Sequence, residues 1–226
     1  MRGLVIAIDG PAGAGKSTLA KRLAKELGYI YLDTGAMYRA LAWKAIVEGV
    51  DPGDEGELKR ILPLTRIELI ECDGEPRVLL DGEDVTSRIR TPQVSQMASR
   101  ISTFKTVRDR MVELQRAMGS RGGVVAEGRD IGTVVFPGAD VKIYLDASPE
   151  ERARRRFVEL KGLGKQVTLE ETLAEMNERD RRDQERAVAP LRKAEDALVI
   201  DSSSLSAEAV VERVMRVIKS TMPAIQ

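Results

Sequence analysis

Residues 10–18 form a glycine-rich loop of a kind that binds phosphate. The segment matches the pattern G-x-x-x-x-G-K-[ST] and consists of Gly10, Pro11, Ala12, Gly13, Ala14, Gly15, Lys16, Ser17 and Thr18. In such a loop the backbone N–H groups surround a polyphosphate, and the N-terminus of the next helix adds partial positive charge. Lys16 can reach the outer phosphates, and the Ser17 hydroxyl can bind a magnesium ion. The loop therefore predicts a site for a nucleoside triphosphate.

The sequence on both sides of the loop predicts the elements that position it. Leu4–Ile8 is a short apolar run typical of a buried strand. Leu19, Leu23 and Leu27 recur at helical spacing, and Gly28 follows as a stop signal. A glycine-rich turn between a strand and a helix is the context in which this motif binds phosphate, which favours a site over a chance turn.

Short apolar runs that end in an acid recur along the chain and predict a parallel sheet. They are Val5–Asp9, Ile30–Asp33, Val124–Glu127, Ile143–Asp146 and Leu198–Asp201. Helical patterns follow most of them, so the expected fold is α/β, with a P-loop core of about five parallel strands flanked by helices. Ligands in such folds bind beyond the carboxyl ends of the strands, where these acids lie.

One segment breaks the alternation of strands and helices. Ile67–Glu71 and Arg77–Leu80 are extended runs, and Asp73-Gly74 between them is a hairpin signal. We expect a small antiparallel insert over residues 51–87.

Two expected capping boxes, in which the side chains of the first and fourth residues each accept a backbone N–H of the other, predict a pair of helices late in the chain. They are Ser148–Glu151 and Thr168–Glu171, and a glycine-containing turn lies between the two helices. A helical hairpin over residues 151–185 is suited to be a lid. The remaining segments form the expected core: 1–50, 88–150 and 186–226.

Composition excludes several classes of function. Basic and acidic residues are equal at 36 each, which argues against a general nucleic-acid-binding surface. The chain has no His, which excludes His-based catalysis and His metal sites. Its one cysteine, Cys72, allows no intrachain disulfide and is interpreted as a small apolar filler in a strand. No apolar stretch approaches the roughly 20 residues that span a bilayer, and no signal peptide is recognised, so we expect a cytoplasmic protein.

Arginine placement suggests a second anionic substrate. Most of the basic residues are arginines, whose planar fork suits phosphate. Genome base composition or adaptation to heat would explain the bias but not the placement of Arg39 and Arg129, which follow two predicted strands. Other uses of the loop fit less well, because the only Asn is Asn177 and a GTPase base-reading motif is therefore absent.

Longer blocks of sequence resemble bacterial cytidylate kinases. Besides the loop, the matching blocks are Leu32–Arg39, Glu127–Pro137, Tyr144–Ser148, Glu178–Asp180 with Asp183 and Arg186, and Ala187–Leu191. Thr34 stands where Ser is common in that family and keeps the hydroxyl. The resemblance implies a nucleoside monophosphate kinase fold and transfer of a phosphoryl group from ATP to CMP or dCMP, with UMP a poor substrate. It also implies that the insert over residues 51–87 binds the monophosphate. We expect no nucleic-acid partner, no membrane partner and a monomer.

The resemblance implies roles for residues on the acceptor side. The phosphate of CMP would be bound by Thr34, Tyr38, Arg39, Arg129 and Arg186. The ribose would be held by Arg179 and Asp183, and cytosine would be contacted by Ser99, Arg108 and Asp130. Lys16, Arg129 and Arg186 would be the catalytic residues. Because the acceptor is already an anionic oxygen, the reaction needs placement and charge neutralisation rather than a general base.

On the ATP side, the arginines that begin the lid are candidates for contacts with the triphosphate. Among Arg152, Arg154, Arg155 and Arg156 the sequence does not decide, and Arg155 and Arg156 are taken as the candidates. Mg²⁺ is expected to bind Ser17, with Asp33 orienting a metal-bound water. Asp9, Asp146 and Asp201 are rival acids at strand ends, and any of these acids could instead cap a helix.

Alternatives remain at each level. Arg129 and Asp130 could form a plain ion pair, and Arg179, Asp183 and Arg186, which share one side of a helix, could be a solvated ladder of charges. The acceptor could be UMP, AMP or shikimate in another P-loop kinase. The chain could also be a non-catalytic ATP-binding regulatory module.

Overall fold

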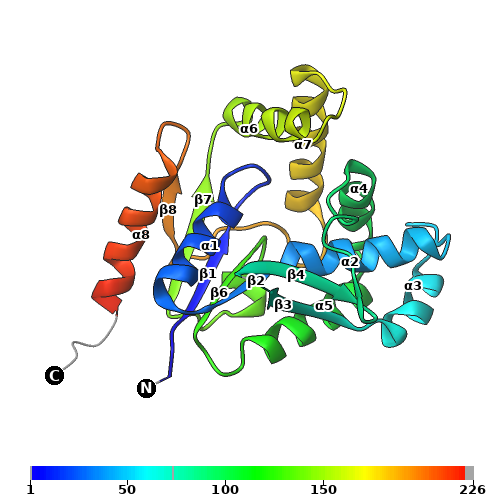
Figure 1. Ribbon diagram of the computed structural model, residues 1–226, viewed down its shortest axis with the longest axis horizontal. Coiled ribbons are helices and arrows are strands. Elements are labelled where there is room, and N and C mark those ends of the chain that lie inside the picture. Colours follow the sequence, from blue (N-terminus) through cyan, green and yellow to red (C-terminus); the bar gives the residue numbers. More distant parts are fainter. Residues whose placement is uncertain (1, 73, 222–226) are drawn as a thin grey trace. The chain divides into compact units, whose positions relative to one another are not determined.

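The computed structural model describes residues 2–72 and 74–221 (Figure 1), which form two compact units. The first unit contains the described residues up to Tyr31 and from Arg121 onward, and the second is Leu32–Ser120. These units are defined by packing alone. The division into core, acceptor-binding insert and lid is a division by function and stays a prediction.

A five-stranded parallel sheet confirms the predicted fold class. Its strands lie in the order β2-β6-β1-β7-β8, with bounds β1 Val5–Asp9, β2 Ile30–Asp33, β6 Val124–Gly128, β7 Val141–Asp146 and β8 Leu198–Asp201. β1 pairs in parallel with β6 and β7, and β7 pairs in parallel with β8. The register places Asp9 opposite Gly128 and Tyr144, so the ends of these strands meet at one edge.

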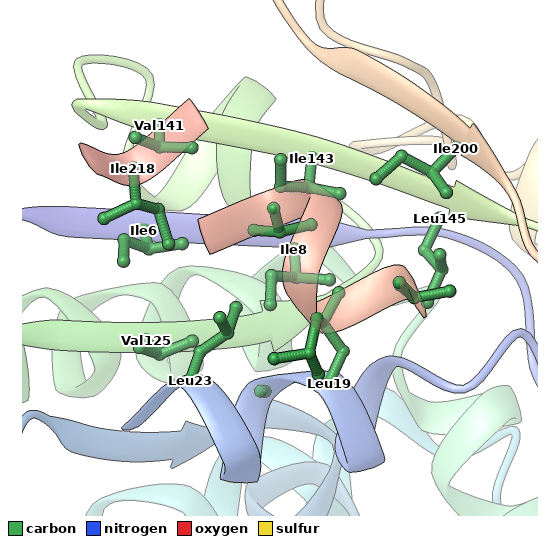
Figure 2. Close-up of a cluster of buried hydrophobic side chains, with 14 of the residues drawn as sticks. Ile6, Ile8, Leu19, Leu23, Val125, Val141, Ile143, Leu145, Ile200 and Ile218 are labelled. Carbon is green, nitrogen blue, oxygen red and sulfur yellow. The ribbon is translucent and has the colours of Figure 1, made fainter. Parts of the chain in front are cut away.

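The core of the first unit lies between this sheet and two helices. Helix α1 (Lys16–Leu27) and helix α8 (Ala207–Thr221) each present an apolar stripe at helical spacing. Leu19 and Leu23 of α1 and Ile218 of α8 are buried against strand residues such as Ile8. Figure 2 shows these side chains gathered between α1, α8 and the strands. This packing fixes the N-terminus of α1, and with it the phosphate-binding loop.

Helices α6 (Pro149–Gly162) and α7 (Leu169–Glu185) form the predicted helical hairpin. Thr168 and Glu171 make the complete reciprocal capping box. At the start of α6 the reciprocal bond is absent: the Ser148 hydroxyl accepts from the Glu151 N–H, but the Ser148 N–H donates to Ser203 Oγ. The Glu151 carboxylate instead accepts from two arginines of its own helix, so the expectation of a full box there was wrong.

The second unit contains a three-stranded antiparallel sheet in the order β3-β4-β5, with helices around it. Its elements are α2 Thr34–Val47, α3 Glu55–Ile61, a 3₁₀ turn at Leu62–Leu64, β3 Ile67–Cys72, β4 Glu75–Leu80, β5 Glu83–Asp84, α4 Pro92–Ile101 and α5 Lys105–Met118. The predicted hairpin is confirmed, although Asp73 lies outside the described residues. Cys72 is exposed at the end of β3, so it does not fill a core. Throughout the described part of the chain, no helix is long and apolar enough to cross a membrane.

The core packing predicts the cost of truncating Leu23. This side chain is fully buried in the cluster of Figure 2, so Leu23→Ala leaves a cavity and should lower the free energy of unfolding by about 2–5 kcal/mol. Urea denaturation monitored by circular dichroism measures the change. Leu64→Ala is the matched control, since Leu64 is 69% exposed and its truncation should cost little. Equal losses in the two variants would contradict this assignment of the core.

Candidate active site

The phosphate-binding loop is packed tightly on its outer side. Gly10 has φ 148°, and a Cβ there would lie 1.9 Å from the Leu145 carbonyl oxygen. Gly13 has φ 76°, and a Cβ there would lie 2.9 Å from the Arg152 carbonyl oxygen. Other residues rarely adopt these φ values, and neither position has room for a side chain. The two glycines therefore let the loop close against β7 and α6.

Lys16 is a buried cation at the first position of α1. Its Nζ donates to the Pro11 carbonyl oxygen at 2.6 Å. The pKa of the amine is lowered to about 7, chiefly by burial and also by the charges of Arg129 and Arg179, while Glu127 and Asp9 partly oppose this shift. A cation held in this way is stabilised by any anion that enters the loop.

Two acids at neighbouring strand ends surround this lysine. Burial raises the pKa of Asp9 to about 6, although its carboxylate accepts from the N–H groups of Ile131 and Gly132 at 2.7 Å each. These bonds tie β1 to a π-helical turn, Ile131–Val135, that follows the Arg129 segment. Glu127 is also buried and accepts from the Tyr31 hydroxyl at 2.6 Å. Glu127 ends a predicted strand but was not among the acids expected to compete for the metal-bound water.

Asp33, expected near the metal, caps a helix in the second unit. Its carboxylate accepts from the Ala36 N–H at 2.7 Å and from Arg39 at 3.0 Å. This is the capping role that the sequence left open, and it places Arg39 at the start of α2. Asp146 and Asp201 bind neighbouring groups of their own loops. The metal role of Asp33 stays a prediction.

A buried cluster of charges joins the Arg129 segment to the end of α7 within the first unit. Arg129 Nε donates to Asp183 at 2.9 Å, and Arg186 lies 3.8 Å from Asp130 and 3.9 Å from Asp183. Burial alone would raise the pKa of Asp183, but Arg129, Arg179 and Arg186 together hold it below its usual range. The cluster thus carries more cations than anions, which suits a bound phosphate.

Two alternatives that the sequence left open, a solvated ladder of charges on α7 and a plain ion pair between Arg129 and Asp130, are therefore wrong. Asp183 and Arg186 are only 4% and 9% exposed, so this side of α7 is not a solvated ladder. The carboxylate that accepts from Arg129 is Asp183 rather than the adjacent Asp130. By contrast, Arg181 on the same helix is exposed and pairs with Glu178, as a surface charge does.

The second unit contains Ser99 and Arg108, two of the three residues expected at the base, whereas the third, Asp130, belongs to the first unit. Arg108 is 2% exposed, lies over the Tyr38 ring at 5.6 Å and donates to the Ser102 carbonyl oxygen at 3.3 Å. The Ser102 hydroxyl in turn donates to the Ser99 carbonyl oxygen. Thr34 is buried at the start of α2. Arg108 is thus held by its own unit in a fixed place beside Tyr38.

The arginines of α6 divide into two pairs. Arg152 donates to the carbonyl oxygens of Ala12 and Ala147 and pairs closely with Asp180, and Arg155 reaches Ala14. Arg154 and Arg156 pair with acids of α6 near the surface. The sequence could not separate these pairs, because all four stand within five consecutive positions. A role in binding ATP stays a prediction for Arg155 and Arg156.

The oxygen donors at the loop fit a magnesium ion carried by a nucleotide. Within residues 2–72 and 74–221 there is no group of three or more His, Cys, Asp or Glu that could hold a metal by itself. Mg²⁺ usually keeps several waters and binds one or two protein oxygens plus substrate phosphates. Ser17, which is exposed at the start of α1, and the strand-end acids Asp9 and Glu127 offer such donors.

The low pKa of Lys16 predicts pH-dependent binding of ATP. Phosphates raise the pKa of the amine, so the complex holds the proton more tightly than the free protein does. The affinity is therefore full below pH 7 and falls as the pH rises through the free pKa of about 7, by at most about tenfold per pH unit. Titration calorimetry of MgATP at several pH values, in buffers of different ionisation enthalpy, measures the affinity and the proton uptake.

Two variants complete this test. Lys16→Met should bind MgATP weakly and with no such pH dependence. Lys25→Met, on an exposed part of the same helix, should keep the wild-type profile. A flat affinity profile for the unmodified protein would contradict the assigned pKa.

Comparisons with known proteins show the family to which this chain belongs. The family described as cytidylate kinase matches residues 6–220. A cytidylate kinase from Pelotomaculum thermopropionicum is 56% identical over 211 residues, 93% of each chain, and one from Geobacter sulfurreducens is 51% identical over 96% of this chain and 94% of the relative. A solved structure, TT1252 from Thermus thermophilus, shares the fold with a TM-score of 0.51 and 20% identity, over 99% of this chain and 100% of the other. The chain belongs to the cytidylate kinase family.

Proposed function

We propose that this protein transfers the γ-phosphoryl group of ATP to CMP or dCMP, giving ADP with CDP or dCDP. The observation that carries the proposal is a single unit that contains both the loop with buried Lys16 and the cluster of half-buried Arg129 with buried Asp183 and Arg186. One cationic site suits the donor phosphates, and the other suits a second anion. The relatives named cytidylate kinase support CMP as that second substrate.

The loop binds the donor. Its N–H groups and the N-terminus of α1 hold the phosphates of ATP, and Lys16 exchanges the Pro11 carbonyl for a phosphate oxygen. Ser17 would bind Mg²⁺, with Asp33, Glu127 or Asp9 orienting its waters, and the ion would neutralise charge on the β- and γ-phosphates.

The arginines bind the acceptor. In the free protein Asp183 holds Arg129 and lies near Arg186. When CMP binds, the ribose hydroxyls donate to Asp183, Arg179 supports the ribose, and Arg129 and Arg186 turn to the phosphate. Thr34, Tyr38 and Arg39 of the second unit contribute to the same phosphate. Because the phosphate oxygen is already a nucleophile, these residues act by placement and charge.

Recognition of cytosine follows from hydrogen-bond chemistry. The N4 amino group of cytosine donates to the Asp130 carboxylate, while Arg108 donates to O2 or N3 and Ser99 contacts the base. Uracil carries an oxygen at the corresponding position, which would face the Asp130 carboxylate with no proton between them. The carboxylate therefore disfavours UMP as well as favouring CMP.

In the proposed function the helical hairpin is a lid that moves, and the small antiparallel sheet belongs to the part that binds the acceptor. Gly164, with φ 73°, ends the turn region between α6 and α7, which supports a hinged lid over 151–185. The three-stranded sheet lies within 51–87, the proposed acceptor-binding insert.

A substrate panel tests the function. A coupled assay for ADP with CMP, dCMP, UMP and AMP should show turnover with the two cytidine nucleotides and little with the others. Lys16→Ala should abolish turnover, as should removal of Mg²⁺ by a chelator until Mg²⁺ is restored. Equal rates on CMP and UMP would overturn the proposed recognition of cytosine, and unchanged transfer by Lys16→Ala would overturn the role of the loop.

The buried cluster predicts a selective effect of Arg129. Arg129→Ala should lower kcat/KM for CMP by about 100- to 1000-fold, the usual cost of losing a group that stabilises transferring charge. Binding of ATP should not weaken, because Arg129 lowers the pKa of Lys16 and its removal relieves that effect. Arg181→Ala is the matched control on α7 and should keep kcat/KM within about twofold, since its surface ion pair contributes little. Equal losses in both variants would contradict the assignment.

A further inference from the structure

The outer side of the phosphate-binding loop is held through its carbonyl groups. The N–H groups of the loop serve the phosphates, so the carbonyl oxygens on its outer side need other partners. The Ala12 carbonyl accepts from Arg152 at 3.2 Å. The Ala14 carbonyl accepts from Ser202 Oγ at 3.0 Å and from Arg155 at 3.4 Å. None of the roles assigned above uses Ser202.

Ser202 lies at the meeting point of three segments. It follows β8, is 3% exposed, and its N–H donates to the Asp146 carbonyl at the end of β7. Its hydroxyl donates to Ala14 and accepts from Arg155 Nη1 at 3.0 Å, and its carbonyl accepts from Arg155 Nη2 at 2.6 Å. Its hydroxyl and both of its backbone polar groups are therefore engaged in holding the loop, α6 and the sheet together.

The neighbouring serines do not share this position. Ser203 Oγ donates to Asp201 and accepts from the Ser148 N–H, so it stabilises the start of α6. Ser204 is exposed. Three consecutive serines thus differ in their contacts, and Ser202 is the one whose hydroxyl bonds to the phosphate-binding loop.

A peptide plane transmits the effect of Ser202 to the phosphate side. The Ala14 carbonyl and the Gly15 N–H belong to one planar trans peptide group and point in opposite directions. Donors that fix the carbonyl therefore fix the direction of the N–H. They also polarise the peptide group, which makes the N–H a stronger donor to an anion.

We propose that Ser202 is a positioning residue for ATP, which acts through Arg155 and the Ala14–Gly15 peptide and does not itself contact the nucleotide. The proposal rests on the proposed function only in taking ATP as the donor. Removing the hydroxyl leaves the Ala14 carbonyl with the longer bond to Arg155 and takes an acceptor from that guanidinium. Because hydrogen bonds to charged groups are strong, the affinity for ATP should fall about tenfold.

Direct binding measurements test the proposal. Titration calorimetry gives the Kd of MgATP and, separately, of CMP for the full chain, Ser202→Ala and the control Ser204→Ala. We expect the Kd of MgATP to rise about tenfold in Ser202→Ala, with the Kd of CMP unchanged within about twofold and Ser204→Ala like the unmodified protein. An unchanged Kd for MgATP would overturn the proposal. Equal weakening of both ligands would also overturn it, because that result indicates a general loss of structure.

A double-mutant cycle tests the route through Arg155. If Ser202 acts through Arg155, Ser202→Ala should raise the Kd of MgATP clearly less in the Arg155→Lys variant than it does in the unmodified protein. Additive losses would overturn the proposed route. Because these titrations need no phosphoryl transfer, failure to phosphorylate CMP would overturn the proposed function and leave this test intact.

Discussion

The buried ammonium group of Lys16 is the constraint on which the rest of the site depends. It is bonded to a carbonyl oxygen rather than to a carboxylate, and burial brings its pKa to about 7. Arg129 and Arg179 add further positive charge, which Glu127 and Asp9 only partly offset. The site is therefore short of negative charge until phosphates enter it, and this shortage is the physical basis for binding polyphosphate. A carboxylate directly paired with Lys16 would stabilise the free protein and compete with the substrate.

The same logic explains Asp183. Three arginines that lie close together in or at the edge of the interior would repel one another and turn toward solvent, and the carboxylates of Asp183 and Asp130 prevent this. Asp183 holds Arg129 at 2.9 Å while its own pKa stays low. Two carboxylates among three arginines still leave net positive charge for a second phosphate. In the proposed reaction the ribose hydroxyls donate to Asp183 in place of Arg129. Arg129 and Arg186 are then free to bind the phosphate of the same nucleotide.

The sequence predicts the parts of this protein that depend on local pattern. The loop, α1 and the five strands follow from glycine positions, apolar runs and helical spacing within a few residues of each other. The bond between Arg129 and Asp183 joins residues 54 positions apart, and no local pattern encodes it. In the sequence, Arg152, Arg154, Arg155 and Arg156 form one cluster. In the structure, the orientation of α6 about its axis places Arg152 and Arg155 at the loop and Arg154 and Arg156 near the surface. The sequence likewise did not reveal that Glu127 is buried beside Lys16 or that Cys72 is exposed. The burial of a strand residue depends on what packs over the strand, which the strand's own residues do not show.

The contacts of α6 also limit how a lid can move. Arg152 and Arg155 lie about one helical turn apart, and both bind carbonyl groups of the phosphate-binding loop. Asp180 of α7 pairs with Arg152, which fixes the end of α7 that also carries Asp183. The beginning of α6 and the end of α7 therefore cannot move without disturbing the loop and the arginine cluster. In the proposed function, a closing motion would therefore be confined to the far end of the hairpin, around the turn at Gly164, where Leu163 and Leu169 are exposed and no such bonds oppose it among the described contacts.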